Sequence, residues 1–337
     1  MKLENYVDLM LPAIEEELFK TVGWVKNFDS GDLYDLLTYH MGWSGDNDLP
    51  AAKGKRIRPL MVALCTDAAG GDWRHALPAA AGVELIHNFS LIHDDIEDNS
   101  PLRRGRPTLW KKWNIPLAIN AGDAMFTLAH LAVLQLENIT SSTIALQAVR
   151  LLHETCLRLT SGQHLDISYE SRDVLEIEAY WPMVQGKTAA LLAASTELGS
   201  VVAGCDRDTR ATYREFGYSL GLAFQALDDL LGIWGDSALT GKSAESDLIT
   251  RKKSLPVLYG LSVNSQFATR WKQGSIGIMD LREVASLLEE EGAREYTQKI
   301  ADQYTTQALN LLSAARLEPQ AGAAIQELAH QLLRRRS

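Results

Sequence analysis

The amino-acid sequence predicts an all-α protein built as a bundle of helices. The chain has 337 residues but only 10 prolines and 24 glycines, so long stretches contain no residue that breaks a helix. Alanine and leucine dominate these stretches, and runs of β-branched residues are scarce. The uninterrupted segments are about 15 to 25 residues long, which is typical of bundle helices. With 46% hydrophobic residues, the chain can bury a sizeable core.

Polar segments that contain glycine or proline separate the predicted helices. The longest spans 29–55 and follows the first helix, and shorter breaks lie at 70–71, 99–107, 138–142, 204–208 and 235–246. Because no repeat and no low-complexity tract divides the chain, we predict one domain over 1–337. Within it, a helix and a loop-rich segment occupy 1–52, the motifs that carry chemistry occupy 53–260, and C-terminal helices occupy 261–337.

Charge and cysteine content exclude several functions. The net charge is −10, so no basic field attracts a nucleic acid. Cys65, Cys156 and Cys205 are widely spaced, which suits reduced thiols in a cytoplasmic protein. The N-terminal residues include Glu4 and Asp8 and lack the basic and apolar regions of a signal peptide. We also expect no apolar run near the ~20 residues of a membrane span. A soluble, cytoplasmic protein is predicted.

The predicted helix 78–98 carries acids on a face that otherwise looks like core. His87, Asp94 and Asp98 recur at helical spacing, and apolar residues cover much of the remaining surface. A buried carboxylate is costly unless it is paired or bound to a cation. Because Asp94 and Asp98 lie one turn apart, their oxygens can share Mg²⁺, which leaves positions for substrate phosphates. The alternative is a solvated helix end that happens to be acidic.

A second acidic pair, Asp228 and Asp229, lies far along the chain on the predicted helix 212–234. Gln225 precedes it by about one turn on the same face. The alternative interpretation is a glutamine and an acidic pair that cap a buried helix. Two acidic pairs on two buried helices can converge on a cluster of Mg²⁺ ions, and a diphosphate is the ligand that best fits such a cluster.

Five short basic segments accompany the acidic pairs. They are 54–59, 103–107, 186–188, 241–242 and 251–254. The first opens a helix, where free N–H groups and the helix dipole favour an anion. The second follows Asp98 by five residues, and its arginines suit bidentate phosphate contacts. Any one such segment is more often a solvated surface charge, but five around two acidic pairs indicate phosphate binding.

These motifs resemble those of the trans-isoprenyl diphosphate synthases, also called the polyprenyl synthetase family. The resemblance rests on GKRIRP at 54–59, LIHNFSLIHDDIED at 85–98, RRG at 103–105, and FQ followed by DD within 224–229, and it covers roughly residues 50 to 260. It implies the isoprenoid synthase fold, which is a single-domain antiparallel helix bundle around a deep central cavity. It also implies a homodimer, with the two acidic clusters facing each other across the mouth of the cavity.

The resemblance assigns roles to individual residues. The Mg²⁺ ligands it implies are Asp94, Asp98 and Asp228, with about three ions when substrate is bound. The pocket for isopentenyl diphosphate is implied to contain Lys55, Arg58, His87 and Arg104. The groups holding the allylic diphosphate are implied to be Arg103, Lys187, Thr188, Gln225, Lys242 and Lys252. Gln163 and Asp166 match a helix that lines the cavity. The residues implied to take part most directly in catalysis are Asp94, Asp98, Arg103, Lys187, Asp228 and Lys242.

The implied reaction is a head-to-tail condensation. Isopentenyl diphosphate adds to dimethylallyl, geranyl or farnesyl diphosphate and gives a short-chain all-trans prenyl diphosphate. Mg²⁺ and basic side chains stabilise the charge on the leaving diphosphate, so no side-chain nucleophile is needed. Water must be excluded, because it would trap the allylic cation.

The second acidic motif departs from the family pattern at Gly232. Many relatives carry a third aspartate at this position. Metal binding at this motif therefore rests on Asp228, with Asp229 or Asp236 as the candidates that assist it.

The segment after the second motif, which the resemblance implies is a mobile lid, departs as well. Glu245 stands where a glycine is common, and Arg251 replaces the glycine before the last lysine. Both changes affect the geometry with which the lid closes rather than the class of reaction.

Phe89 and Ser90 predict the length of the product. In the resembling family, a bulky aromatic five residues before the first acidic motif restricts chain growth, and a second aromatic four residues before it restricts growth further. Here one ring has a small neighbour, which resembles the archaeal-type geranylgeranyl diphosphate synthases, so we expect a C20 product with C15 (farnesyl) as the alternative. On a helical wheel Ser90 lies about 40° from Asp94 and Phe89 about 140° away, so Phe89 can also be a core residue.

Two other classes of protein compete with this interpretation. A type I terpene cyclase of the same fold usually pairs its acidic motif with an Asn/Ser/Glu triad on a later helix, and none is visible near Asp228. Such a cyclase also lacks a second diphosphate pocket. A non-catalytic subunit of a synthase heteromer typically loses one acidic motif, whereas both are present here.

Overall fold

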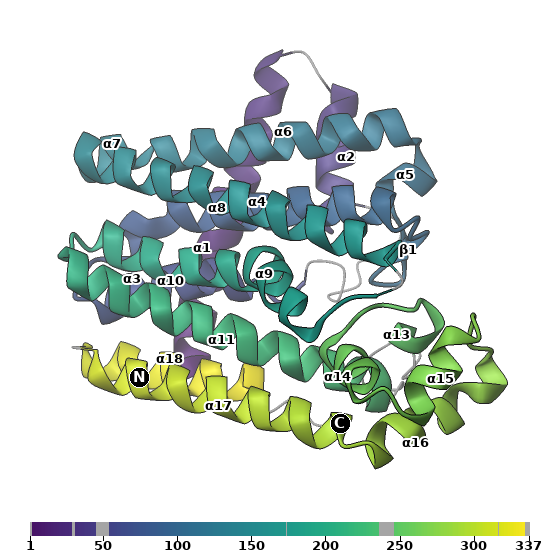
Figure 1. Ribbon diagram of the computed structural model, residues 1–337. Helices are drawn as coiled ribbons and strands as arrows, with labels where there is room; N and C mark the ends of the chain where they lie inside the picture. The colour runs from purple at the N-terminus through teal and green to yellow at the C-terminus, as the bar shows by residue number, and fades with distance from the viewer. Residues whose placement is uncertain are drawn as a thin grey trace. The chain divides into compact units, whose positions relative to one another are not determined.

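The computed structural model describes residues 2–28, 31–44, 54–172, 174–235, 246–315 and 317–333. These residues are almost entirely helical (Figure 1), which confirms the predicted all-α class. Within them, the β structure is one antiparallel hairpin formed by β1 (Leu102–Arg103) and β2 (Arg106–Pro107). The hairpin falls in the predicted break 99–107.

The described residues form helices of very different lengths. The α-helices are α1 (Leu3–Gly23), α2 (Gly31–His40), α3 (Ile57–Ala68), α4 (Leu77–Glu97), α5 (Leu109–Lys112), α6 (Ile115–Leu134), α7 (Leu136–Ile139), α8 (Ser142–Glu170), α9 (Tyr180–Val184), α10 (Ala190–Val202), α11 (Arg207–Trp234), α13 (Ser246–Ile249), α14 (Leu255–Val263), α15 (Gln266–Lys272), α16 (Leu281–Glu290), α17 (Ala293–Ala314) and α18 (Pro319–Leu333). Tighter or wider turns form η1 (Trp24–Phe28), η3 (Trp73–Ala76), η4 (Ile177–Ala179), η5 (Gln185–Ala189) and η6 (Ile278–Asp280). The predicted helix 78–98 is α4, and 212–234 is the main part of α11.

Contacts divide the chain into two compact units. Unit 1 comprises Met1–Cys156, Ala194–Ala211 and Arg316–Ile325, and unit 2 comprises Leu157–Ala193, Thr212–Ala315 and Gln326–Ser337. The predicted single domain over 1–337 stays a prediction.

The core of unit 1 is built on the pairing of α4 with α6, which run side by side (Figure 1). Leu85 and Ile92 of α4 are buried, as are Met125 and Ala129 of α6. A small residue allows the close approach, because a Cβ atom at Gly82 would lie 2.5 Å from a side-chain methyl of α6 and 2.9 Å from a backbone oxygen. This pairing fixes α4, the helix that carries the first acidic motif.

The core of unit 2 surrounds the C-terminal half of α11. Ala226 and Leu230 of α11 pack with Ala301 of α17, and Figure 1 shows these two long helices side by side. On another side, a Cβ atom at Gly221 would lie 2.6 Å from the Cα atom of Ala189 in η5, so α11 also approaches that segment closely. The second acidic motif therefore sits on a helix that is packed on more than one side.

The segment Ile115–Ile139, which covers α6 and α7, is long and apolar enough to cross a membrane by length and composition. The expectation that no apolar run approaches such a length is therefore wrong for this segment. Core helices of soluble proteins meet the same criterion, and α6 packs along α4. That the protein has no membrane span stays a prediction.

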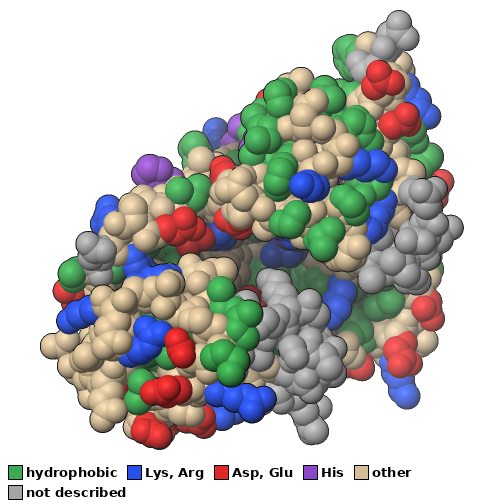
Figure 2. Space-filling view, turned by 90° about the vertical axis from the view of Figure 1, so that its right-hand side faces the viewer, with side chains coloured by type: hydrophobic (Ala, Val, Ile, Leu, Met, Phe, Trp, Pro, Cys, Tyr) green, Lys and Arg blue, Asp and Glu red, His purple; other side chains and the backbone are tan. Residues whose placement is uncertain are grey.

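Charges of both signs are interspersed on the surface that Figure 2 displays. Acidic and basic side chains lie among scattered hydrophobic ones on this face. Such a mixed surface accords with the acidic overall charge of the chain and differs from the continuous basic surface of a nucleic-acid-binding protein.

Candidate active site

Three residues predicted to bind isopentenyl diphosphate lie together in unit 1. Arg58, in the first turn of α3, places its Nη1 atom 3.3 Å from Nε2 of His87 on α4. Arg104 lies in the turn of the β1–β2 hairpin, and its guanidinium lies against Gly54, where a Cβ atom would be 2.7 Å from both Nη atoms. Lys55, the fourth predicted residue, directly follows Gly54 and is exposed. The start of α3, the hairpin and α4 thus meet at one group of cations.

Two histidines lie close to these arginines. Burial and the charges of Arg58, Arg104 and Arg103 lower the pKa of His87 well below its usual value. Burial and the charges of Arg103 and Arg104 lower the pKa of His40, the last residue of α2, to about 3. Both imidazoles are therefore neutral at neutral pH. We call His40, Arg58, His87 and Arg104 the basic pocket.

A buried ion-pair network holds the start of α3 beside the basic pocket. Arg56 is only 4% exposed; its Nη1 atom donates to Glu84 of α4 at 2.8 Å and its Nε atom donates to Glu15 of α1 at 2.5 Å. Its Nη2 atom donates to the carbonyl of Met41, and Trp43 donates to the second oxygen of Glu15. Such a network is costly to break, because a lone buried charge would remain. Arg56 therefore fixes the segment that carries Lys55 and Arg58.

The first acidic motif ends α4. Asp94 is partly buried, Asp98 is exposed, and the N–H of Asp98 donates to the carbonyl of Asp94 at 2.8 Å. Asp95 between them is buried and accepts two hydrogen bonds of 2.9 Å from Nε of Arg103. Burial raises the pKa of Asp95, and the bonds from Arg103 oppose that rise. Arg103, predicted to hold the allylic diphosphate, is thus oriented by a buried carboxylate beside Asp94 and Asp98.

The predicted metal ligands do not form a complete cage. Among the described ranges, no three histidine, cysteine or acidic side chains lie close enough to hold a metal ion. Asp94 and Asp98 lie one turn apart and offer only carboxylate oxygens, the donors that Mg²⁺ prefers. A site with two carboxylates needs further oxygen ligands, which a diphosphate and water can supply. The donor set therefore fits a metal that binds together with its substrate.

Lys187 and Asp166, predicted on separate segments, form an ion pair in unit 2. The pair depends on two glycines, because a Cβ atom at Gly162 of α8 would lie 2.2 Å from the N atom of Lys187, and one at Gly186 would lie 2.8 Å from Cα of Gly162. The two backbones therefore touch where α8 crosses η5. Gln163, the other predicted residue of α8, lies next to this crossing and is partly buried.

Thr188 and Gln225 connect this crossing to the second acidic motif. The hydroxyl of Thr188 donates to Oε1 of Gln225 at 2.7 Å, and Nε2 of Gln225 donates to Asp229 at 2.8 Å. Asp229 also accepts from the hydroxyl of Tyr180 at 2.8 Å and from the N–H of Leu255 at 2.9 Å. Burial raises the pKa of Asp229 to about 6. Three donors thus fix Asp229 as a support for the site, and Asp228 remains the predicted metal ligand.

A carboxylate from another helix fills the space beside Gly232. A Cβ atom at Gly232 would lie 2.4 Å from Oδ2 of Asp247 on α13. The place next to α11 where many relatives carry an acidic side chain is therefore occupied by a different acid. Burial alone would lower the pKa of Lys252, but the charges of Asp247 and Asp229 outweigh burial and raise it. Lys252 therefore lies among the acids of the second motif.

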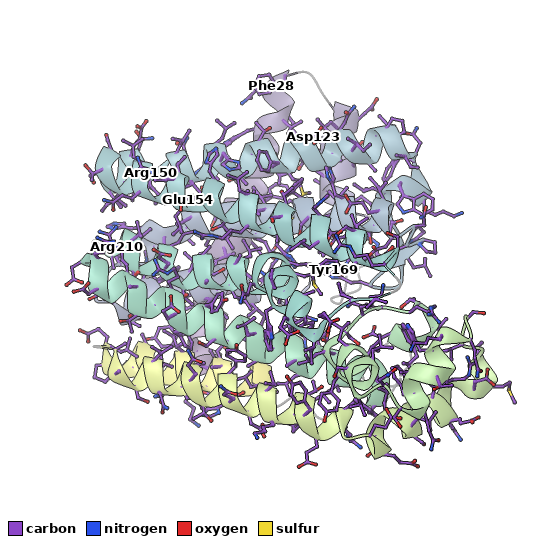
Figure 3. All side chains as sticks on the ribbon, in the orientation of Figure 1. Phe28, Asp123, Arg150, Glu154, Tyr169 and Arg210 are labelled. Atoms are coloured by element: carbon purple, nitrogen blue, oxygen red, sulfur yellow. The ribbon has the colours of Figure 1, made fainter. Side chains whose placement is uncertain are left out.

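The other basic residues of the segment 251–254 are Arg251 and Lys253, and both contact residues outside the site. Arg251 adopts φ +57°, a conformation that glycine favours, and its guanidinium stacks 4.3 Å from the ring of Trp271 and donates to that residue's carbonyl. Lys253 donates to the carbonyls of Tyr169 and Arg172 at the C-terminal end of α8, where Figure 3 labels Tyr169. Of this segment, Lys252 alone has the acidic surroundings of the site. Lys242, Asp236 and Glu245 lie outside the described residues.

The two predicted chain-length residues differ in their contacts. The ring of Phe89 packs edge-on against Phe126 of α6, with centroids 5.2 Å apart, and against His93 at 4.8 Å. Ser90 donates its hydroxyl to the carbonyl of His87 at 2.8 Å. Phe89 therefore lies between α4 and α6, and its role in chain length stays a prediction.

Sequence reasoning missed several residues near these groups. Arg56 lies inside the basic segment 54–59, but nothing in the sequence indicates that its side chain is buried. Glu84 lies one turn before Asn88 and looks like any helix acid in the sequence. Asp247 lies five residues before Lys252, and its proximity to this lysine was the available signal. His40 lies far from every motif in the sequence, and nothing local marks it.

Comparison with known proteins identifies relatives along most of the chain. The family model of polyprenyl synthetase matches residues 47–281. A (2E,6E)-farnesyl diphosphate synthase of Mycobacterium tuberculosis is 38% identical over 312 residues, which are 90% of this chain and 86% of that protein. A geranylgeranyl diphosphate synthase of the same species is 38% identical over 294 residues, which are 85% of this chain and 83% of that protein.

Solved structures give the same result. A polyprenyl synthetase from Streptomyces coelicolor A3(2) has a TM-score of 0.89 and 35% identity, and the match covers 98% of this chain and 100% of that one. A geranylgeranyl pyrophosphate synthetase from Pyrococcus horikoshii has a TM-score of 0.88 and 30% identity, with 99% and 98% covered. The family match, the identities and the fold agree with the resemblance of the motifs. The chain belongs to the polyprenyl synthetase family.

Proposed function

We propose that this chain is a short-chain trans-prenyl diphosphate synthase, an enzyme that condenses isopentenyl diphosphate head to tail with an allylic diphosphate. The observation that carries the proposal is the meeting of Arg58, His87 and Arg104 on and beside α4, the helix that ends in Asp94 and Asp98. His87 and Asp94 are two helical turns apart, or about 10 Å along the axis. An anion pocket and an acidic pair at this separation suit two diphosphates whose hydrocarbon ends must react.

In this proposal, the basic pocket receives isopentenyl diphosphate. Arg58 and Arg104 supply guanidinium donors for the diphosphate oxygens, Lys55 adds an ammonium, and neutral His87 adds a hydrogen bond. Arg56 holds the segment of Lys55 and Arg58 in place through its bonds to Glu84 and Glu15.

The allylic diphosphate is held by a second set of residues. They are Arg103, Lys187, Thr188, Gln225, Lys242 and Lys252. Asp95 orients Arg103, and Asp166 orients Lys187. Asp94, Asp98 and Asp228 hold Mg²⁺, and Asp247 supports the second motif beside Gly232. When bound, Mg²⁺ supplies positive charge that neutralises the leaving diphosphate.

The side chains guide a reaction that the substrates themselves carry out. Arg103, Lys187 and Lys252 stabilise the negative charge that develops as the allylic C–O bond breaks. The double bond of isopentenyl diphosphate forms the new C–C bond with the allylic carbon, and a proton then leaves the adduct, for which the released diphosphate is a suitable base. Buried apolar side chains such as Ile92 of α4 keep water away from the cation.

We propose a C20 product, geranylgeranyl diphosphate. Phe89 supplies one aromatic ring five residues before the first acidic motif, and the neighbouring Ser90 has a small side chain. The similar proteins of Mycobacterium tuberculosis bear the names of both a C15 and a C20 enzyme, so the choice rests on these two side chains. Phe89→Ala should then shift the product beyond C20, and Ser90→Phe should shorten it towards C15. Phe19→Ala, which removes a ring that is 52% exposed on α1, is the control.

We also propose a cytoplasmic homodimer. Exposed hydrophobic side chains line α6 and the start of α8, among them Ile115, Leu131 and Leu146, which is 65% exposed. A second copy is the simplest cover for them. Burial raises the pKa values of Cys65 and Cys156, as expected for unreactive thiols in a reducing compartment.

One assay tests the proposed function. Purified protein is incubated with Mg²⁺, isopentenyl diphosphate and dimethylallyl diphosphate, and the products are identified by mass after dephosphorylation. The expected product is the C20 alcohol. A C15 alcohol would correct the chain length only. A cyclic hydrocarbon would assign the chain to the cyclases, and the absence of any product would overturn the proposal.

A further inference from the structure

His40 lies in the basic pocket, yet neither its sequence context nor the family motifs give it a role. It ends α2 and lines a small pocket together with Asp95, Arg103 and Arg104. The end of α2 is tied to the hairpin that carries these arginines, because the hydroxyl of the adjacent Tyr39 donates to the carbonyl of Pro107 at 3.0 Å. His40 is therefore held beside the arginines by a defined contact.

Two buried nitrogen atoms of the basic pocket, Nε2 of His40 and Nε of Arg58, have no hydrogen-bond partner within the described part of the chain, and neither has the buried Oδ1 atom of Asn88 on α4. Asn88 is a hydrogen-bonding neighbour of His40 that opposes the fall of its pKa. The charge of Arg104 acts on His40 and on Arg58, so both lie in the field of the same guanidinium. A buried polar atom without a partner costs free energy and persists where a ligand can complete it. Because each of these nitrogen atoms can carry a proton, each can donate a hydrogen bond to an acceptor atom of a ligand.

The charge state of His40 indicates what this residue can contribute to ligand binding. Its imidazole is neutral at neutral pH, because burial and the surrounding arginines disfavour a further positive charge. A neutral ring can donate one hydrogen bond without adding to the repulsion among the arginines. This hydrogen bond forms only when an acceptor lies in the right direction. His40 therefore distinguishes ligands by the position of their oxygens rather than by their net charge.

We propose that His40 is a further substrate-binding residue, whose Nε2–H group donates a hydrogen bond to the diphosphate of isopentenyl diphosphate. This inference rests on the proposed function, since it takes the basic pocket as the site of that substrate. It adds α2 to the elements that form the pocket, which are otherwise α3, α4 and the β1–β2 hairpin.

Two variants of His40 test the proposal. His40→Leu removes the donor at similar size, and His40→Gln places an amide N–H near the former Nε2. We expect His40→Leu to raise the KM for isopentenyl diphosphate about tenfold or more and to change the KM for the allylic substrate less than about threefold. His40→Gln should recover most of the loss. His75→Leu, an exposed histidine of η3 in the same unit, should leave both constants unchanged.

A direct binding measurement complements the kinetics. The ring nitrogen signals of ¹⁵N-histidine-labelled wild-type protein are followed by NMR as isopentenyl diphosphate is added without allylic substrate, and His40 is assigned from the signal that His40→Gln loses. A large shift of the His40 signal at saturation supports the contact. This measurement uses the unaltered protein, so it decides the matter even if His40→Leu does not fold.

The outcomes separate this proposal from the proposed function. If wild-type protein makes prenyl diphosphate but His40→Leu keeps its KM for isopentenyl diphosphate, or the His40 signal does not move on saturation, the role of His40 is overturned and the function stands. Equal increases of both KM values in His40→Leu, without recovery in His40→Gln, would make the residue structural and also overturn the proposal. Wild-type protein that neither binds isopentenyl diphosphate nor forms product would overturn both.

Discussion

The cations of unit 1 and those of unit 2 are held in opposite ways. In the basic pocket, positive charges lie against one another: burial and neighbouring arginines lower the pKa values of Arg58 and Arg104. In unit 2, the described cations Lys187 and Lys252 lie beside acids. Lys187 is paired with Asp166, and the charges of several acids raise the pKa of Lys252.

This difference indicates how each group meets a diphosphate. An anion that enters the basic pocket relieves repulsion and completes buried donors, so it needs no additional cation. An anion that approaches the acids beside Lys187 and Lys252 is repelled until positive charge is added. Acids also gather at the end of α4, where Asp94 and Asp98 are the metal ligands that we propose. One substrate should therefore bind to the protein alone, and the other should bind together with Mg²⁺.

The largest expected effect concerns Asp94. Asp94→Ala removes one of two carboxylates that we propose as shared metal ligands, so turnover should fall by about three orders of magnitude. The fold should remain, because the change shortens one partly buried side chain in the last turn of α4. Steady-state rates and circular dichroism of the variant measure the two effects. The exposed Asp8 of α1 provides the control, since Asp8→Ala should keep wild-type turnover. Wild-type turnover in Asp94→Ala would remove this residue from the metal site.

The next effect concerns the framework of the basic pocket. Arg56→Met removes the partner of Glu84, which is 3% exposed, and leaves a buried charge uncompensated. The free energy of unfolding should fall by about 3–5 kcal/mol, as measured by urea denaturation. Arg74→Met breaks the exposed pair of Arg74 and Asp72 and should change it by less than about 0.5 kcal/mol. If the two variants lose the same stability, the buried network does not hold the pocket.

A smaller and more selective effect distinguishes the two groups of cations directly. Lys55→Ala should raise the KM for isopentenyl diphosphate about tenfold and leave the KM for the allylic substrate nearly unchanged, and Lys187→Ala should do the reverse. Initial rates with each substrate varied in turn provide both constants. Asp166→Asn, which releases Lys187 from its partner, should resemble Lys187→Ala in direction. Equal effects on both substrates in both lysine variants would show that the roles are assigned wrongly.

The helices could be predicted because their signals are local. The apolar pattern that predicted 78–98 depends on side chains within one helix, and α4 spans Leu77–Glu97. The start of α11 was placed too late, since 204–208 was interpreted as a break. Asp206 in that segment accepts a hydrogen bond from the N–H of Thr209 at 2.8 Å and so begins the helix. A polar residue that interrupts a pattern can equally begin the next helix.

The site could be predicted only in part, because its residues come from distant segments. Asp94, Asp98 and Asp228 were visible as acids on apolar helices, whereas the meeting of Arg58 with Arg104 was implied only by the family resemblance. His40 and Asp247 lie on helices without a motif, and their positions follow from packing between segments. The sequence shows that Gly232 stands where many relatives carry a third aspartate. The three-dimensional arrangement reveals that Asp247 fills the space beside it.

Equilibrium binding with and without Mg²⁺ tests the contrast between the two groups of cations most directly. Isopentenyl diphosphate and geranyl diphosphate are each titrated alone into the protein by calorimetry, once with Mg²⁺ and once with EDTA. We predict that the Kd of isopentenyl diphosphate changes less than about threefold when Mg²⁺ is removed, whereas that of geranyl diphosphate rises about thirtyfold or more. Equal dependence of both ligands on Mg²⁺, or no dependence of either, would contradict this account.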